Sequence, residues 1–324
     1  MTIGSHLEEF HGLPAFTFPD TDDTPTDASS LPAPDSVAWR IAVDSYEAEE
    51  QWEEAFARFL KAVDTQQVRA LIVGAWSDVY DTGPDEVIGA LVAARDRLPT
   101  LRGLFLGDIV MEECEISWIV QGDVAPLLEA FPGLEEFAVR GGNQLAFPAV
   151  RHERLRKLTV ESGGIPVAAV RGIADSDLPA LVDLDLWLGT PEYGGDAEVA
   201  DLEPFFAGSR LPRLTRLALH NSEIQDAICA ALASAPVVAR LEVLDVSMGV
   251  LTDDGATALL TGQPLTHLKK LDLHHNYLSA ALRTRLLQTL EGAGVEVDVD
   301  VDDADADADA DEDGTVWRFV AVGE

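Results

Sequence analysis

The apolar phrase L-x-x-L-x-L recurs eight times along this chain and constrains its fold more than any other feature. The eight copies begin at Val68, Leu101, Leu134, Leu155, Leu181, Leu214, Leu241 and Leu268. Equivalent positions lie 21 to 33 residues apart, about 28 on average, and helical patterns fill most of the intervals. One such unit cannot bury its own apolar face, so neighbouring units must stack to form a core. The sequence therefore predicts a solenoid.

The phrase is the signature of leucine-rich repeats, and a period near 28 with a helix in each unit favours the ribonuclease-inhibitor-like subclass. We therefore expect an α/β horseshoe with a parallel sheet on the concave side and helices on the convex side. About eight repeats would be closed by terminal caps.

Four segments follow from the pattern. Residues 1–36 are predicted to form an N-terminal extension with a flexible linker, because residues 19–36 are rich in Asp, Thr, Ser and Pro. Residues 37–66 read as a strand and helix that cap the solenoid, and residues 67–294 hold the repeats. Residues 295–324 predict a strand, an acidic loop and a closing strand that returns to cover the open edge.

Composition limits the classes of partner. The chain has 58 acidic and 22 basic residues, a net charge of −36. Such a surface repels phosphate groups, which argues against binding to nucleic acid or anionic membranes and favours a basic partner. No secretory signal or apolar span is visible, and two cysteines give no disulfide framework. We expect a cytoplasmic monomer without a cofactor.

The strands should expose three columns of residues on the concave face, since alternate residues of a strand point to opposite sides. The column before each strand leucine contains Glu136, Lys157, Asp183 and Arg216, which predicts a ladder of ion pairs. The N-terminal third of the face is apolar, and the C-terminal third is acidic with histidines. Candidate contact residues on this face are Phe105, Arg140, Asp185, Arg216, His220, Asp245, Asp272 and His274.

The histidines and aspartates at the C-terminal end of the face admit a second interpretation, a metal or hydrolytic site in place of a binding surface. His220 and His274 occupy one column beside Asp245 and Asp272, a set of residue types found in metal and hydrolytic sites. However, the two histidines should lie two strands apart, about 9–10 Å between backbones. Metal-dependent or hydrolytic chemistry is therefore an alternative, and no metal ligand is assigned.

Three long units carry extra residues directly after a strand, at 74–83, 107–121 and 188–198, so all three insertions should emerge on one rim. Binding residues concentrate in loops on a rigid scaffold, and aromatic side chains are typical of binding hot spots. The candidates on this rim are Trp76, Tyr80, Trp118, Trp187 and Tyr193. The alternative is that these rings only pack the insertions against the solenoid. Cys114, which stands among glutamates, should be a poor nucleophile.

Several phrases extend beyond the repeat consensus, including 115–119 (EISWI), 186–189 (LWLG), 271–279 (LDLHHNYLS) and 318–322 (RFVAV). Together they resemble a bacterial family of cytoplasmic leucine-rich-repeat proteins of actinobacterial type, over most of the chain. The resemblance implies the fold and an accessory role beside radical-SAM and ATP-grasp-like enzymes. It carries over no functional residues.

The expected function is non-enzymatic binding of a protein or peptide through the concave sheet and the insertion rim. The alternatives are the metal-dependent or hydrolytic activity and a structural role in which the acidic surface masks a basic partner.

Overall fold

The computed structural model describes residues 4–20, 31–46, 48–301, 309–310 and 316–323. Twelve strands form one open sheet whose spatial order follows the chain from β1 to β12. From β2 onward all neighbouring strands run parallel, and only β1 is antiparallel to its neighbour. The fold is therefore α/β, with a mostly parallel sheet covered by helices.

The strands of this sheet are short, and each repeat phrase contributes one of them. They are β1 (Glu9–Phe10), β2 (Leu13–Thr17), β3 (Ala38–Ile41), β4 (Ala70–Val73), β5 (Gly103–Leu106), β6 (Glu136–Arg140), β7 (Lys157–Glu161), β8 (Asp183–Gly189), β9 (Arg216–Ser222), β10 (Val243–Asp245), β11 (Lys270–Asp272) and β12 (Glu296–Asp298).

Helices connect most pairs of strands. The α-helices are α1 (Trp52–Ala62), α2 (Asp85–Ala93), α3 (Ala125–Ala130), α4 (Val167–Asp175), α5 (Glu203–Ala207), α6 (Gln225–Leu232), α7 (Asp253–Thr261) and α8 (Ala280–Leu290). Short 3₁₀ turns supplement them at η2 (Thr65–Gln67), η3 (Arg95–Arg97), η4 (Pro191–Tyr193), η5 (Val199–Leu202), η6 (Pro236–Arg240) and η7 (Glu291–Ala293). The shortest unit, between β6 and β7, connects its strands by a loop without a helix.

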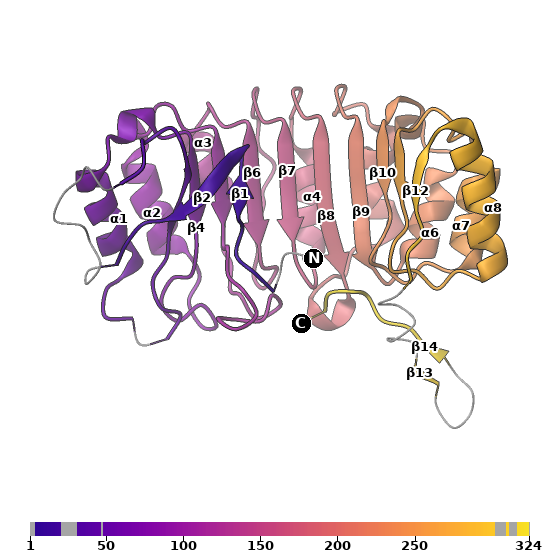
Figure 1. Ribbon diagram of the computed structural model, residues 1–324, viewed down its shortest axis with the longest axis horizontal. Helices are drawn as coiled ribbons and strands as arrows, with labels where there is room; N and C mark the ends of the chain where they lie inside the picture. The colour runs from indigo at the N-terminus through magenta and orange to yellow at the C-terminus, as the bar shows by residue number, and fades with distance from the viewer. Residues whose placement is uncertain (1–3, 21–30, 47, 302–308, 311–315, 324) are drawn as a thin grey trace.

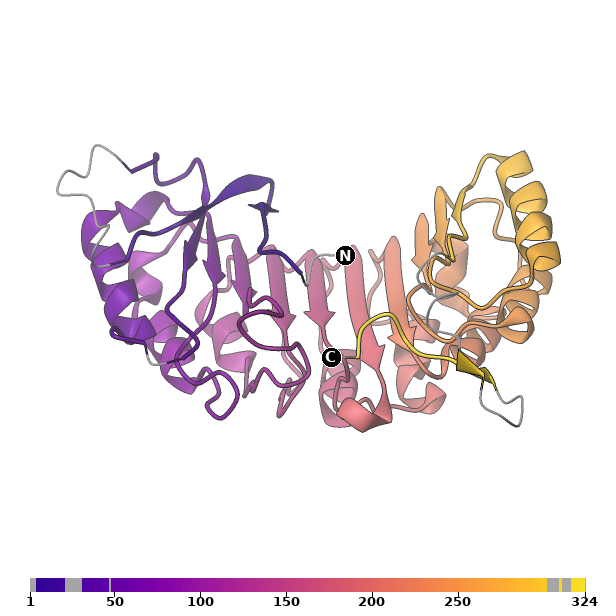
Figure 2. The same ribbon diagram turned by 60° about the horizontal axis from the view of Figure 1, so that its bottom comes forward.

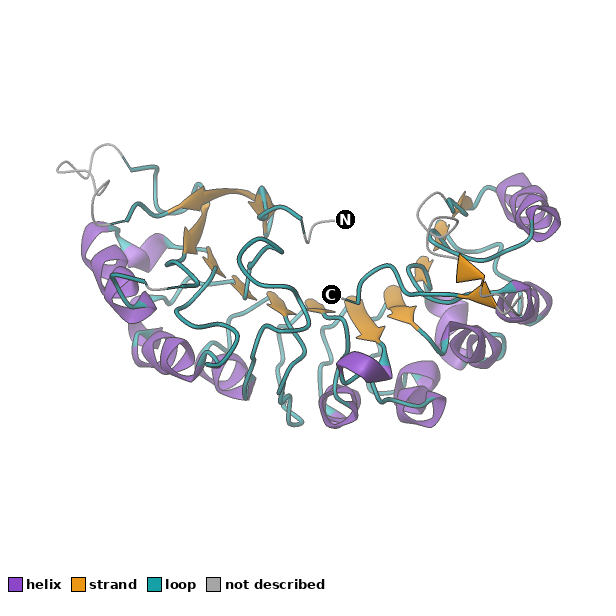
Figure 3. Ribbon diagram, turned by 90° about the horizontal axis from the view of Figure 1, so that it is seen from below, coloured by secondary structure: helices purple, strands orange, loops and turns teal. Residues whose placement is uncertain are grey.

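The molecule is an arc with the strands along its inner side and the helices along its outer side (Figure 1; Figure 3). The strands pair in register, so that repeat leucines stack on one another, as Leu184 does on Leu217 and Leu217 on Leu244. These side chains are fully buried in one continuous apolar cluster that runs from Phe18 to Val295. Stacking of apolar faces between units thus supplies the core.

The N-terminal extension contributes two strands to the sheet, β1 and β2. Within this extension, β2 adds to the sheet beside β3 through the pair Phe16–Trp39. β1, which precedes β2, pairs with it in an antiparallel hairpin that lies over the inner side of the arc (Figure 2). Residues 21–30 of the predicted linker lie outside the described residues.

The C-terminal segment differs from the expected closing strand. β12 ends the sheet, and among the described residues that follow it β13 (Asp309–Ala310) and β14 (Val316–Trp317) pair in a hairpin that is separate from the sheet. Residues 318–323 then turn back along the rim toward the middle of the arc (Figure 2). Most of the predicted acidic loop, residues 302–308 and 311–315, lies outside the described residues. Within the part of the chain that is described, no helix has the length and apolarity needed to cross a membrane.

Candidate functional site

The concave columns form as the strand alternation predicts. The parallel register places Ile72, Phe105, Ala138, Thr159, Asp185, Ala218, Asp245, Asp272 and Asp298 side by side in one column. Two ion pairs of the predicted ladder are present: Lys157 Nζ lies 3.0 Å from Glu136 Oε1, and Arg216 Nη1 lies 2.8 Å from Asp183 Oδ1. Cross-strand neighbours on one face of a sheet interact in this way.

The apolar N-terminal third of the concave face is covered by the chain itself. The ring of Phe10, in β1, packs edge-on against Phe105 with 5.7 Å between centroids. Phe105 is consequently 3% exposed and belongs to a small cluster with Ala70, Ile72 and Ala138. His11 Nδ1 contacts Glu136 Oε2 at 3.0 Å and fixes the tip of the hairpin. The structure thus leaves no accessible surface at Phe105 for the predicted partner.

Arg140 is also removed from the surface. Its buried guanidinium lies between two carboxylates, with Nε 2.7 Å from Glu161 Oε2 and Nη1 3.5 Å from Asp108 Oδ1. Arg40 Nε binds the other side of Asp108 at 2.7 Å. Burial raises the pKa of Glu161 even though Arg140 opposes the shift. Arg140 therefore acts as the centre of a buried ionic network, in which each charge depends on its partner.

Arg216 joins three strands, β8, β9 and β10, at the middle of the face. Its guanidinium contacts Asp183, Asp185 and Asp245, at 2.8, 2.8 and 3.3 Å. Burial would lower the pKa of Arg216, but the three carboxylates outweigh it and raise that pKa. The predicted residues Asp185, Arg216 and Asp245 are thus brought together, and their charges largely satisfy one another.

His220 links the same cluster to Ser247. Its Nε2 lies 2.8 Å from Asp185 Oδ1, and its Nδ1 lies 3.3 Å from Ser247 Oγ. These three residue types recur in nucleophilic catalysis. Here, however, the Ser247 hydroxyl donates to Asp245 Oδ1 at 2.6 Å, and Ser247 is 1% exposed. A hydroxyl that is already bound and covered has no route to a substrate, so this arrangement favours a structural role.

His274 belongs to a different pair. Its Nδ1 lies 2.7 Å from Asp272 Oδ1, and Lys270 Nζ lies 3.0 Å from Asp272 Oδ2. One ligand-type atom from each of Asp272, His274 and Asp298 falls within a 4.8 Å group, although the ammonium of Lys270 already neutralises that corner. His220 and His274, which a shared metal ion would have to bring together, instead pair with different carboxylates, Asp185 and Asp272.

The aromatic residues of the rim fall into two groups. Trp76 is 3% exposed and donates from Nε1 to the Thr82 carbonyl at 2.7 Å. Trp187 is 7% exposed and packs edge-on against His220, 5.6 Å between centroids. Tyr80 is half-buried beside the ring of Tyr46, 5.8 Å away. For these three rings the packing alternative describes what the structure shows.

Trp118 and Tyr193 form the second group. They line a cavity of about 430 Å³ together with Ser117, Gly142, Asn143, Gln144, Pro166, Glu192 and Gly194. Trp118 is 50% exposed, and Gln144 adopts a left-handed backbone with φ of 59°. Non-glycine residues in that conformation cluster at functional sites. This rim pocket is the place where two of the predicted aromatic residues meet around an open space.

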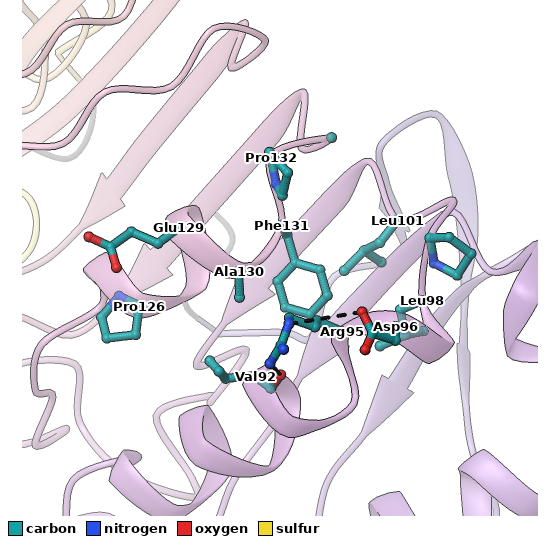
Figure 4. Close-up of a pocket in the computed structure, with 12 residues that line it drawn as sticks. Val92, Arg95, Asp96, Leu98, Leu101, Pro126, Glu129, Ala130, Phe131 and Pro132 are labelled. Carbon is teal, nitrogen blue, oxygen red and sulfur yellow. Dashed lines mark hydrogen bonds and ion pairs between the residues drawn. The ribbon is translucent and has the colours of Figure 1, made fainter.

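A larger cavity, of about 670 Å³, lies on the helical side between the C-terminal ends of α2 and α3 (Figure 4). Its walls include the apolar side chains of Leu98, Leu101 and Phe131 beside the ion pair of Arg95 and Asp96. It contains no predicted site residue and no group of nucleophilic or metal-ligating side chains. We regard it as a gap between successive repeats.

Cys114 cannot serve as a nucleophile in the rim. Burial raises the pKa of its thiol to about 11, an effect only partly offset by the hydrogen bond from Tyr80, and the residue is 1% exposed. This outcome agrees with the expectation from its acidic neighbours.

One set of residues, those that hold segment 319–323 against the rim, has no signal in the repeat pattern. Asn221, Met248 and His275 contact the backbone of this segment, and Ser117 binds its end. The alternation of Val320 and Val322 indicated an extended segment, but nothing local in the sequence identified the surface on which it lies.

No family model matches the chain, and no curated relative matches it. Among solved structures, the chain is similar to the crystal structure of a protein from Bacteroides fragilis, a structural-genomics target, with 28% sequence identity and a TM-score of 0.73. The similarity covers 85% of this chain and 74% of that one. It supports the α/β architecture with its long, mostly parallel sheet.

Proposed function

We propose that the chain is a leucine-rich-repeat scaffold that binds a protein or peptide without catalysing a reaction. The eight repeat phrases, their in-register stacking and the helices on the outer side support the assignment of the repeat class. Repeat solenoids present extended inner surfaces that suit macromolecular ligands. The cytoplasmic location and the monomeric state remain predictions.

The rim pocket carries this proposal. Trp118 keeps half of its surface exposed, and it lines the cavity of about 430 Å³ together with Tyr193. Exposed aromatic side chains beside a concave pocket are typical anchors of protein interfaces. The neighbouring amides of Asn143 and Gln144 can supply hydrogen bonds to a ligand backbone.

The charge of the surroundings defines the kind of ligand. Glu192 lines the pocket, and the net charge of the chain is −36. A basic segment would be attracted by this field, whereas an anionic polymer would be repelled. We therefore propose a protein segment with lysine or arginine near an aromatic or aliphatic anchor.

Binding is favoured over chemistry because the polar clusters of the inner face are internally paired. His220, Arg216 and Asp185 satisfy each other, and the Ser247 hydroxyl is covered. A displayed peptide library selected against the full chain would test the proposal. We expect selected peptides to be basic and to lose at least tenfold in affinity with Trp118→Ala or Tyr193→Ala.

Tyr46→Ala is the matched control, because Tyr46 is 58% exposed and does not line the pocket. It should leave the affinity unchanged. Ligands that bind the Trp118→Ala and Tyr193→Ala chains as tightly as the parent chain would contradict the proposal.

A further inference from the structure

Residues 319–323 form a segment that we name the strap. The strap crosses the ends of strands β11, β10 and β9 and ends beside the rim pocket (Figure 2). The contacts that hold the strap are made mainly to its backbone. His275 Nε2 lies 3.1 Å from the Phe319 carbonyl, and the Ala321 N–H donates to the Met248 carbonyl at 2.8 Å. Because backbone groups are common to all peptides, these contacts do not depend on the identity of the strap residues.

Asn221 makes the most specific of these contacts. Its side-chain Nδ2 donates to the Val322 carbonyl at 2.7 Å, and its Oδ1 accepts from the Val322 N–H at 2.9 Å. A side-chain amide that pairs with both backbone groups of one residue fixes an extended peptide in direction and register. Asn221 is itself fully buried, so the clamp is formed in a place from which water is excluded.

The rim is built for this contact in three successive units. Asn221, Met248 and His275 each lie five positions after the first residue of their strand, and all three have a positive φ, of 52°, 64° and 49°. A positive φ is uncommon for residues other than glycine. Backbone strain of this kind is kept at ligand clamps, and here each of the three strained residues contacts the strap.

One side-chain pocket adds selectivity. Val322 is 1% exposed in a cluster with Ile116, Trp187 and Met248, whereas Phe319 is 50% exposed. A small residue is favoured at the next position, because a Cβ on Gly323 would make a tight contact of 3.2 Å with Tyr193 Cε2. On the groove side, a Cβ on Gly163 would lie 2.3 Å from the Gly323 carbonyl oxygen.

We propose that this rim groove is a docking site for an extended peptide segment of a partner protein, and that the strap is its competing occupant in cis. The proposal rests on the proposed binding function and deepens it, because the groove leads directly to Trp118 and Tyr193. The ligand would carry a β-branched residue at the position of Val322, followed by glycine. A basic residue would precede them, as Arg318 does above the ring of Tyr277, 5.7 Å from its centroid.

The test uses the full chain with the strap displaced. Val322→Asp puts a carboxylate into the apolar cluster and should release the strap while the groove residues stay unchanged. A labelled peptide with the sequence of residues 317–323 is then titrated by fluorescence anisotropy. We expect it to bind the Val322→Asp chain at least tenfold more tightly than the parent chain, whose groove is occupied.

Two controls make the result specific. The double variant Val322→Asp, Asn221→Ala should lose the gain, because the clamp is gone. A peptide with aspartate at the position of Val322 should not bind. Equal binding to the double variant, or no binding to a Val322→Asp chain whose strap amides exchange rapidly with deuterium, would overturn the proposal.

A second variant distinguishes loss of the fold from loss of peptide binding. If Val322→Asp abolishes cooperative unfolding, Ala321→Pro releases the strap by removing the N–H that binds Met248. Loss of the fold in both variants would show that the strap is an integral part of the structure and would also overturn the proposal. Library peptides that need Trp118 but do not compete with the strap peptide would preserve the pocket function and refute only the groove.

Discussion

His220 Nε2 lies 2.8 Å from Asp185 Oδ1 at the centre of the inner face, on two adjacent strands. The imidazole is 4% exposed, and Asp245 Oδ1 lies 3.5 Å from its other nitrogen. Burial disfavours the charged imidazole, but the two carboxylates outweigh it and raise the pKa of His220 above 6.5. The same contact keeps the pKa of Asp185 below its usual value, against the effect of burial. This pair therefore couples protonation to folding.

The first prediction concerns pH. Because the folded state binds the His220 proton more tightly than the unfolded chain does, this proton stabilises the fold fully below about pH 6.5. That contribution should decrease as the pH rises through the folded-state pKa of His220. Chemical denaturation between pH 5.5 and 9 should show a free energy of unfolding that falls with pH more steeply in the parent chain than in His220→Gln.

His274→Gln is the comparison for that experiment. The hydrogen bond with Asp272 raises the pKa of His274 as well, but its side chain is 31% exposed. Solvent screening should make its effect on the slope smaller. An unchanged slope in His220→Gln would show that this imidazole does not carry the pH dependence.

The second prediction concerns Arg140. Arg140→Met should lower the free energy of unfolding by about 3–5 kcal/mol, because it leaves the buried Glu161 without its partner charge. Arg151→Met, at a side chain that is 70% exposed, should lower it far less although Arg151 also contacts two carboxylates, because solvent screens exposed ion pairs. Urea denaturation of both variants measures the difference. Similar losses would mean that burial of the network adds nothing.

The third prediction compares two helical glycines. Gly172, in α4, lies so close to the loop between β6 and β7 that an added Cβ would be 1.7 Å from the Phe147 carbonyl oxygen. Gly172→Ala should therefore destabilise the fold by about 1–3 kcal/mol. Gly89, in α2, has nothing within 4 Å of that position, so Gly89→Ala should stabilise it by about 0.5–1 kcal/mol. Thermal melts that shift in the same direction would contradict this assignment.

The fourth prediction separates the rim tryptophans. Trp187→Ala should cost about 3–5 kcal/mol, since it removes a buried ring from the cluster with Met248 and Val322. Trp118→Ala should change the stability by less than about 1 kcal/mol, because that side chain is half exposed. Differential scanning calorimetry of the two variants distinguishes packing from a free anchor. A large loss in Trp118→Ala would assign that ring to packing too.

Much of the arrangement of the sheet was predictable. The repeat phase placed Glu136 beside Lys157 and Asp183 beside Arg216, because alternation along a strand and parallel register leave one neighbour for each residue. The position of the insertions after their strands also placed Trp118 and Tyr193 on one rim. His220 and His274 pair with different aspartates, Asp185 and Asp272, and strand alternation alone did not indicate which carboxylate each imidazole would contact.

Two contacts could not be predicted from the repeat pattern. Phe10 covers Phe105, and the strap covers Trp187. The residues of these two contacts are about 95 and about 135 positions apart in sequence, so a local pattern does not relate them. Periodicity reports which face of an element is apolar, but it contains no information about a short remote segment that settles on that face. Such contacts depend on the shape and polarity of the assembled surface.

The sequence by itself determined the order of the units, the columns of the inner face and the rim from which the insertions emerge. These follow from local alternation and from the need of each unit to bury its apolar side against the next. Only the tertiary structure decided which of those residues remain accessible. The hairpin of β1 and the strap each bury part of the face, whereas Trp118 remains half exposed in the pocket that it lines with Tyr193.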